Sequence, residues 1–156
     1  MMTLTTALAC ALTIPGLAQQ EDPQLRREVQ AFYNSFDRTL NAGNHRKLLD
    51  FFDPAWVMVG ADNKTVTLAQ MVEMGKSMKP GNLRSKIVVN SVQANGNEIC
   101  AWITGTMSFR TSRRAKWMTT TERYAETIRR TPNGLKFVYA QALPNLGQWG
   151  WAKPGG

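Results

Sequence analysis

The spacing of apolar residues predicts a long helix near the start of the chain. Asp22-Pro23 suits a helix start, because Asp accepts hydrogen bonds from free N–H groups and Pro fits the first turn. Gly43 suits the end of this helix. Between them, apolar residues recur every three or four positions, as on one face of an amphipathic helix: Leu25, Val29, Phe32, Tyr33, Phe36 and Leu40.

Two shorter helices and a short strand are expected between residues 44 and 82. The first of these two short helices follows Asn44, a helix-capping residue type, and stops before Pro54. A strand is expected over Trp56–Val59. The second helix starts at Thr67–Gln70, which matches a capping box, and Lys79–Asn82 breaks it.

The second half of the chain is rich in β-forming residues. Strands are expected at 83–93, 98–110, 116–130 and 135–143. Asn95-Gly96 separates the first two, and this dipeptide is a strong signal for a tight hairpin. Helices followed by a meander of strands predict an α+β domain, with the helices on one face of an antiparallel sheet.

The first eighteen residues differ from the rest because they carry no charged side chain. Leu4–Leu17 has the length of the apolar region of a secretory signal, and small residues occupy the two positions that a signal peptidase reads. We therefore expect a signal peptide at 1–18, a domain at 19–143 and a Gly- and Trp-containing tail at 144–156. The protein would be secreted or periplasmic. A buried N-terminal helix is the alternative.

Removal of this segment would have a further consequence. Cys10, one of two cysteines in the sequence, would leave with it, so the mature chain could form no internal disulfide bond. No apolar run reaches about 18 residues, so we expect no transmembrane span after signal removal.

Two segments carry a resemblance to a known family. In 36–52 a helix ends in an Asn41-Ala42-Gly43 corner and a short helix follows, and 129–138 looks like a closing hairpin. Their order and spacing resemble the nuclear transport factor 2-like superfamily, and within it the SnoaL-like group. The resemblance implies a strongly curved sheet that forms a cone (a cystatin-like α+β barrel), with three N-terminal helices packed in its concave face. It also implies an apolar pocket and frequent dimerisation through the outer sheet face.

Enzymes of this superfamily place Asp, His or Tyr in the pocket, but no Asp or His follows residue 62 here. Glu122, Tyr124 and Glu126 share one face of a predicted strand, because side chains alternate with period 2. If this face turns inward, a buried Glu beside a Tyr would have a raised pKa and could act as a general acid or base. Charge pairing on the surface is the alternative.

Aromatic and polar residues could also line a pocket, although they could equally fill a core. The candidates are Tyr33, Trp56, Met58, Tyr124, Tyr139 and Gln141. If the strand face that carries Tyr124 turns inward, Trp102, Thr104 and Thr106 point outward and suit a dimer surface. If the opposite face turns inward, these three residues point into the pocket. His45 is expected at a surface corner. One His far from a Cys gives no metal-ligand spacing, so we expect no metal and no cofactor.

The formal net charge is +8, and it is unevenly distributed. Residues 19–82 carry equal numbers of acidic and basic side chains, so the whole excess lies in 83–156. Basic residues gather at one predicted hairpin end: Arg110, Arg113, Arg114 and Lys116. Such a patch can bind an acidic partner, or it can be a solvated surface that maintains solubility.

Three functions remain open on the sequence. The first is a secreted, dimeric SnoaL-like domain that binds a small molecule in its pocket. The second is a small acid/base enzyme (isomerase, dehydratase or cyclase) that uses Glu122 or Glu126 with Tyr124. The third is a basic module for an acidic partner, whose binding would weaken steeply with salt. Secretion argues against nucleic acid as that partner.

Overall fold

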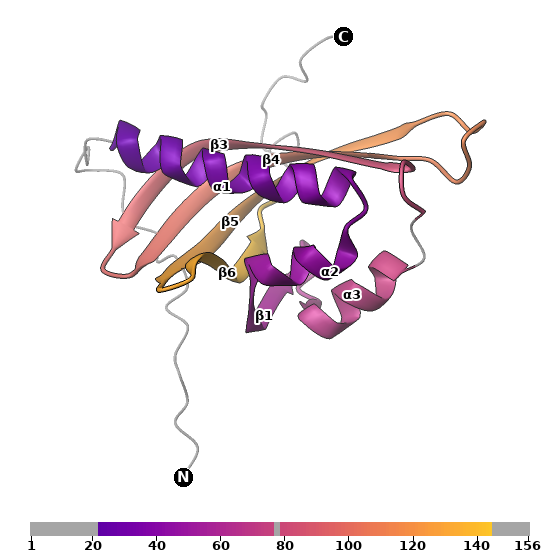
Figure 1. Cartoon of the computed structure of the whole chain (residues 1–156). Coiled ribbons are helices and arrows are strands. Elements are labelled where there is room, and N and C mark those ends of the chain that lie inside the picture. Colours follow the sequence, from indigo (N-terminus) through magenta and orange to yellow (C-terminus); the bar gives the residue numbers. More distant parts are fainter. Residues whose placement is uncertain (1–21, 77–78, 145–156) are drawn as a thin grey trace, which may run out of the picture.

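Three helices and a six-stranded sheet make up the part of the chain that the computed structural model describes, residues 22–76 and 79–144 (Figure 1). The predicted signal peptide and the tail from residue 145 lie outside these residues. None of the described helices is long and apolar enough to span a membrane. In chain order the elements are α1 (Pro23–Asn41), α2 (His45–Leu48), the short 3-10 helix η1 (Leu49–Phe51), β1 (Phe52–Val59), β2 (Thr65–Thr67), α3 (Leu68–Lys76), β3 (Leu83–Asn95), β4 (Glu98–Phe109), β5 (Met118–Thr131) and β6 (Gly134–Ala142).

Helix α1 begins and packs as its sequence indicates. Asp22 Oδ1 accepts hydrogen bonds from the backbone N–H groups of Gln24 and Leu25, at 2.9 and 3.2 Å. Its buried face includes one carboxylate, Asp37, which lies against β3. The hydroxyl of Ser85 donates to Asp37 Oδ1 at 2.7 Å, and the backbone N–H of Ile87 donates to Oδ2 at 2.8 Å. These bonds satisfy the buried carboxylate and attach α1 to the sheet.

The sheet order is β2-β1-β6-β5-β4-β3. Strands β3 to β6 form the expected antiparallel meander, and β1 adds to it in parallel with β6, so the sheet as a whole is mixed. The sequence analysis missed β2, and it started β1 at Trp56 instead of Phe52. No local turn signal marks a parallel pair, because its two strands are joined by a long connection.

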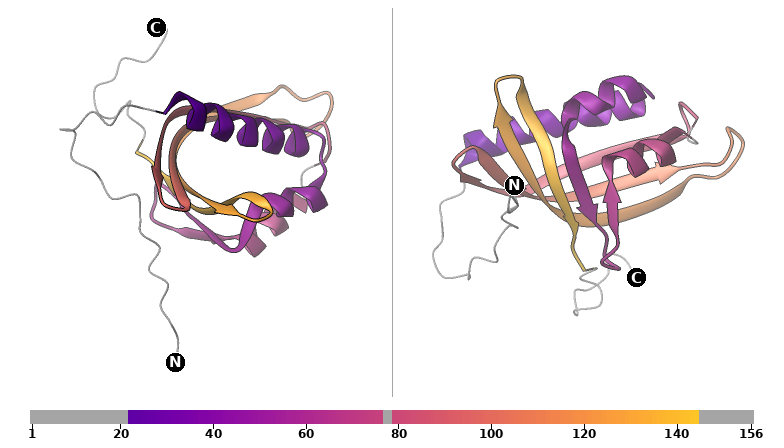
Figure 2. Two further views of the ribbon diagram at one scale, coloured as in Figure 1. Left: turned by 60° about the vertical axis from the view of Figure 1, so that its left-hand side comes forward. Right: turned by 90° about the horizontal axis from the view of Figure 1, so that it is seen from below.

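The sheet is strongly curved, as the family resemblance implied. Register shifts occur in three pairings: between Val89 and Ser91 on β3, between Thr127 and Ile128 on β5, and between Phe52 and Val57 on β1. An extra residue in one strand bends that strand and increases its twist. Figure 2 shows the sheet curling around α1, while α2 and α3 lie at the β1 end. All three helices therefore belong to the concave side.

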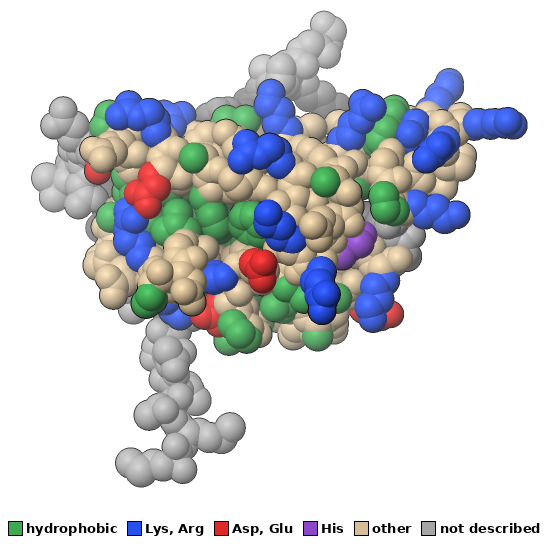
Figure 3. Space-filling model, viewed as in Figure 1, with side chains coloured by type: hydrophobic (Ala, Val, Ile, Leu, Met, Phe, Trp, Pro, Cys, Tyr) green, Lys and Arg blue, Asp and Glu red, His purple; other side chains and the backbone are tan. Residues whose placement is uncertain are grey.

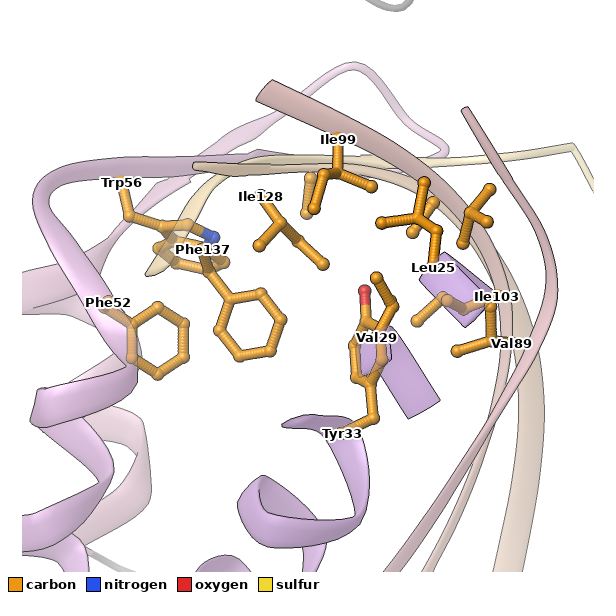
Figure 4. Close-up of a cluster of buried hydrophobic side chains, with 13 residues drawn as sticks. Leu25, Val29, Tyr33, Phe52, Trp56, Val89, Ile99, Ile103, Ile128 and Phe137 are labelled. Carbon is orange, nitrogen blue, oxygen red and sulfur yellow. The ribbon is translucent and has the colours of Figure 1, made fainter. Parts of the chain in front are cut away.

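An aromatic cluster fills the end of the fold nearest β1. The ring of Phe137 lies 4.7 Å from that of Phe32 and 5.2 Å from that of Phe52, measured between centroids. Phe36 and Tyr33 pack on the same ring at 5.3 and 5.4 Å. Figure 4 shows Tyr33 reaching from α1 into this buried group. Rings from α1, β1 and β6 thus join elements that are far apart in sequence.

Cys100 on β4 is disulfide-bonded in this structure of the full chain. The expectation of no internal disulfide bond concerns the mature chain after loss of residues 1–18, and it stays a prediction. The other cysteine, Cys10, lies outside the described residues.

Candidate functional site: two Tyr–Glu pairs on the concave face

Strand β5 directs Tyr124 and Glu126 toward the interior of the cone. Its antiparallel register places them opposite Ile103 and Ala101 of β4, and both of those residues belong to the buried core. Directly paired residues project from the same face of a sheet. Glu122, two positions before Tyr124, lies on this face as well, nearer to solvent. The structure therefore has the inward arrangement that acid/base chemistry requires.

The first pair joins β5 to α1. The hydroxyl of Tyr33 donates a hydrogen bond to Glu126 Oε2 at 2.6 Å. Tyr33 is completely buried, and its pKa is raised well above the ordinary value by burial and by the neighbouring Glu126 charge. Tyr33 therefore remains a hydrogen-bond donor at every physiological pH.

Burial also controls the ionisation of Glu126. It raises the pKa of this carboxyl from 4.5 to about 7, although the hydrogen bond from Tyr33 acts in the opposite direction. At neutral pH both the carboxylate and the carboxylic acid are populated. A group with its pKa near the working pH is suited to give and to take a proton.

The two oxygens of Glu126 differ in their hydrogen bonds. Oε2 accepts the bond from Tyr33, whereas no hydrogen bond between described residues occupies Oε1. Every fully buried side-chain nitrogen or oxygen of the described residues has a partner, so Oε1 is not sealed inside the core. The residue as a whole is half-buried. One carboxylate oxygen is thus held in place by Tyr33, whereas the other has no hydrogen bond from the described residues.

The second pair lies further along the same strand face. The hydroxyl of Tyr124 donates to Glu122 Oε2, and burial with this hydrogen bond raises the pKa of Tyr124. Tyr124 is half-buried and Glu122 is exposed. Successive side chains on one strand face are about 6.6 Å apart. Tyr124 is therefore a second tyrosine hydroxyl on the same strand face as Glu126, and it is bonded to Glu122.

The other predicted pocket residues divide between the two faces of the sheet. Trp56 is buried in the core and Met58 packs against it, so β1 contributes both to the concave side. On β6 the buried Ala140 faces inward, and Tyr139 and Gln141 project from the opposite face. There the Tyr139 hydroxyl donates to Gln141 Oε1 at 2.7 Å. Because neighbouring residues of a strand project to opposite faces, Tyr139 and Gln141 do not line the concave site.

Tyr33 is predicted from the sequence as a pocket residue and Glu126 as an acid/base candidate, with no link between them. They are 93 positions apart, and no spacing rule connects a helix residue with a strand residue at that separation. The one available signal was a tyrosine on the apolar face of a helix, since a buried hydroxyl needs a partner. His45 is exposed on α2. No group of three or more His, Cys, Asp and Glu among residues 22–76 and 79–144 could hold a metal ion.

No protein-family model matches the chain, and no curated protein matches it. Solved structures do. A nuclear transport factor 2-like protein from Salmonella enterica has a TM-score of 0.60 at 14% identity, over 85% of this chain and 94% of that one. A proposed scytalone dehydratase from Novosphingobium aromaticivorans has a TM-score of 0.64 at 12% identity, over 74% and 80%. The association domain of CaMKII from C. elegans has a TM-score of 0.62 at 7% identity, over 76% and 95%.

These likenesses show the fold. The chain has the cystatin-like α+β architecture of the nuclear transport factor 2-like superfamily, and the resemblance seen in the sequence is confirmed at this level. Fold alone does not assign an activity, because one architecture carries many functions. The activity has to be argued from the Tyr–Glu pairs.

Proposed function

We propose that this protein is a small acid/base enzyme of the SnoaL-like type. Glu126 would transfer a proton to or from a small, mainly apolar molecule held against the concave face. The observation that carries this proposal is the environment of Glu126: this inward-facing carboxyl is buried, one oxygen is held by Tyr33, and the other accepts no hydrogen bond from the described residues. The pKa of about 7 supports it, because both protonation states are available at neutral pH.

The reaction follows from the positions of these groups. As a carboxylate, Glu126 removes a proton from carbon through Oε1 while Tyr33 stabilises the charge on Oε2. As an acid, it then returns this proton, either to another carbon of the substrate (isomerisation) or to a departing hydroxyl group (dehydration). Tyr124 stays protonated, and its hydroxyl would exchange Glu122 for a substrate oxygen that gains negative charge. The similarity in fold to a proposed scytalone dehydratase agrees with dehydration.

The test uses a generic carbon acid, 5-nitrobenzisoxazole. A base removes its ring C–H proton, the N–O bond breaks, and a coloured phenolate forms. We expect kcat/KM to rise with pH through an apparent pKa of about 7. Glu126→Gln should lower kcat/KM by roughly 100-fold or more, which is the usual contribution of a positioned acid/base group.

Two further variants make this test specific. Glu73→Gln changes an exposed carboxylate on α3, outside the concave site, and should leave kcat/KM close to that of the unchanged protein. Tyr33→Phe removes the hydrogen bond that lowers the pKa of Glu126, so the rate profile should move to higher pH. Equal rates for folded Glu126→Gln and unchanged protein would refute the proposal.

A second candidate is a dimeric binding domain without catalysis. The outer sheet face supports dimerisation: it carries Trp102 and a ladder of hydroxyls in which Ser108 and Thr119 are 2.8 Å apart. The fold is also shared with an association domain. Light scattering should then give twice the chain mass, and Glu126→Gln should retain ligand affinity while no turnover is found for either form.

We also propose that the protein is exported, on the sequence of residues 1–18 alone. Export with cleavage after Ala18 predicts a mature chain that starts at Gln19. Mass spectrometry of the protein recovered from its producing cells would check this. An intact N-terminus would refute the proposal.

A further inference from the structure

The far ends of β3, β4 and β5 form a projecting arm. We define the basic arm as Arg84–Lys86 of β3 together with residues 106–121, which include the β4–β5 connection. Figures 1 and 2 show this hairpin extending beyond the end of α1. It is the part of the sheet farthest from the aromatic cluster around Phe137.

Positive charge on the basic arm is not neutralised within the described part of the protein. The sequence contains no Asp or Glu between Glu73 and Glu98, and none between Glu98 and Glu122. The ion pairs of the described residues all lie elsewhere on the fold. Figure 3 shows Lys and Arg side chains gathered at the projecting end. The residues concerned are Arg84, Lys86, Arg110, Arg113, Arg114 and Lys116.

Contacts around Trp117 hold the base of this arm in place. The guanidinium carbons of Arg84 and Arg110 lie 4.3 and 4.5 Å from the centroid of its ring, which is cation–π geometry. The Arg110 guanidinium also donates to Asn82 Oδ1 at 3.2 Å and to the carbonyl of Arg113 at 3.1 Å. Arg110 is therefore used inside the protein, whereas Arg113, Arg114 and Lys116 are exposed.

The other face of the arm is apolar and exposed. Phe109 and Met118 are opposite each other in the β4–β5 register, and Met107 lies two positions earlier on the same face. Their exposed fractions are 36%, 47% and 39%. Nearer to α1 the same face of β4 carries the buried Ile103. Large apolar side chains exposed together beside a charged loop indicate an interaction surface.

We infer that the basic arm binds the surface of an anionic lipid bilayer. Such a surface presents phosphate groups to the exposed cations of the β4–β5 connection (Arg113, Arg114 and Lys116) and an adjoining apolar layer to Met107, Phe109 and Met118. A nucleic acid would satisfy the cations, but it has no apolar layer for these three side chains. The combination of charge and exposed apolar area thus favours lipid. This contact is peripheral and independent of the chemistry at Glu126.

Sedimentation of the full chain with lipid vesicles tests this inference. Vesicles of phosphatidylcholine mixed with phosphatidylglycerol should bind the protein, those of phosphatidylcholine alone should bind it weakly, and salt should reduce the difference. Each basic residue near an anionic membrane contributes a factor of roughly five in affinity. Arg113→Gln combined with Arg114→Gln should therefore weaken binding by roughly 25-fold.

Matched controls separate the arm from general charge effects. Arg46→Gln with Lys47→Gln removes the same charge from exposed residues of α2 and should leave vesicle binding nearly unchanged. Met118→Gln should weaken vesicle binding several-fold without changing binding to duplex DNA. Met74→Gln, at a methionine that is 52% exposed on α3, should change neither. All variants keep the same N-terminal segment, so differences among them report on the arm.

Three results would overturn the inference. One is equal binding to vesicles with and without phosphatidylglycerol. Another is equal affinity of the Arg113/Arg114 variant and the Arg46/Lys47 control. The third is binding to duplex DNA as tight as to vesicles with both unaffected by Met118→Gln, which would identify a general polyanion site.

Discussion

The sheet has two different ends. One, the covered end, is buried under α1 and the aromatic cluster, and the other is the exposed basic arm. Along β4, Ile99 and Ile103 are buried under α1 and the aromatic cluster. Met107 and Phe109 continue the same face of the same strand and are exposed. Alternation of apolar residues therefore identifies the apolar face of a strand. It does not show which part of that face is buried by other elements.

The two ends also differ in the charges that they hold. The covered end contains the carboxylate Glu126, which is held by the uncharged hydroxyl of Tyr33. The basic arm holds cations that have no carboxylate partner within the described part of the chain. Burial raises the pKa of Glu126 although the hydrogen bond from Tyr33 acts against it, whereas the exposed cations of the arm are available to a partner. Chemistry is thus expected at one end and surface binding at the other.

The largest expected effect tests the packing of the covered end. Phe137→Ala removes the ring at the centre of the aromatic cluster and should lower the free energy of unfolding by about 3–5 kcal/mol. Met118→Ala on the basic arm should change it by less than about 0.5 kcal/mol. Urea denaturation measures both values. Similar losses in the two variants would show that the arm is as tightly packed as the cluster.

The next effect concerns pH and the buried Glu126. Its pKa is about 7 in the folded state against an ordinary value of 4.5, so the folded state binds this proton more tightly than the unfolded state. The stability that this carboxyl contributes is therefore full below pH 4.5 and is lost as the pH rises to about 7, a change of about 3 kcal/mol. Relative to the unchanged protein, Glu126→Gln should gain stability over this range. Denaturation at a series of pH values would show a constant difference if the carboxyl were exposed instead.

The smallest expected effect lies at the base of the basic arm. Trp117→Ala removes two cation–π contacts and should cost about 1–2 kcal/mol of unfolding free energy, since each contact at an accessible site contributes about 0.5–1 kcal/mol. Trp117→Phe keeps an aromatic face and should recover part of this loss. Thermal unfolding can compare the two variants. Equal stability of the Ala and Phe variants would mean that the ring does not bind the guanidinium groups.

The sequence by itself determined the local elements of this protein. Repeats of three and four residues from Leu25 onward predicted α1, and Asn95-Gly96 predicted the β3–β4 hairpin. The same alternation grouped Glu122, Tyr124 and Glu126 on one strand face. These features depend on residues that are close along the chain, so propensity, capping and turn chemistry were sufficient to predict them.

Tertiary structure alone decided the features that join distant residues. The parallel pairing of β1 with β6, the short strand β2 and the bond between Tyr33 and Glu126 leave no periodic signal in the chain. The outward position of Tyr139 was likewise decided by pairing around Ala140. Long-range contacts form only where several elements pack together, and packing decides which predicted face is buried. The carboxylate that could do chemistry was visible in the sequence, but its partner and its raised pKa came from the fold.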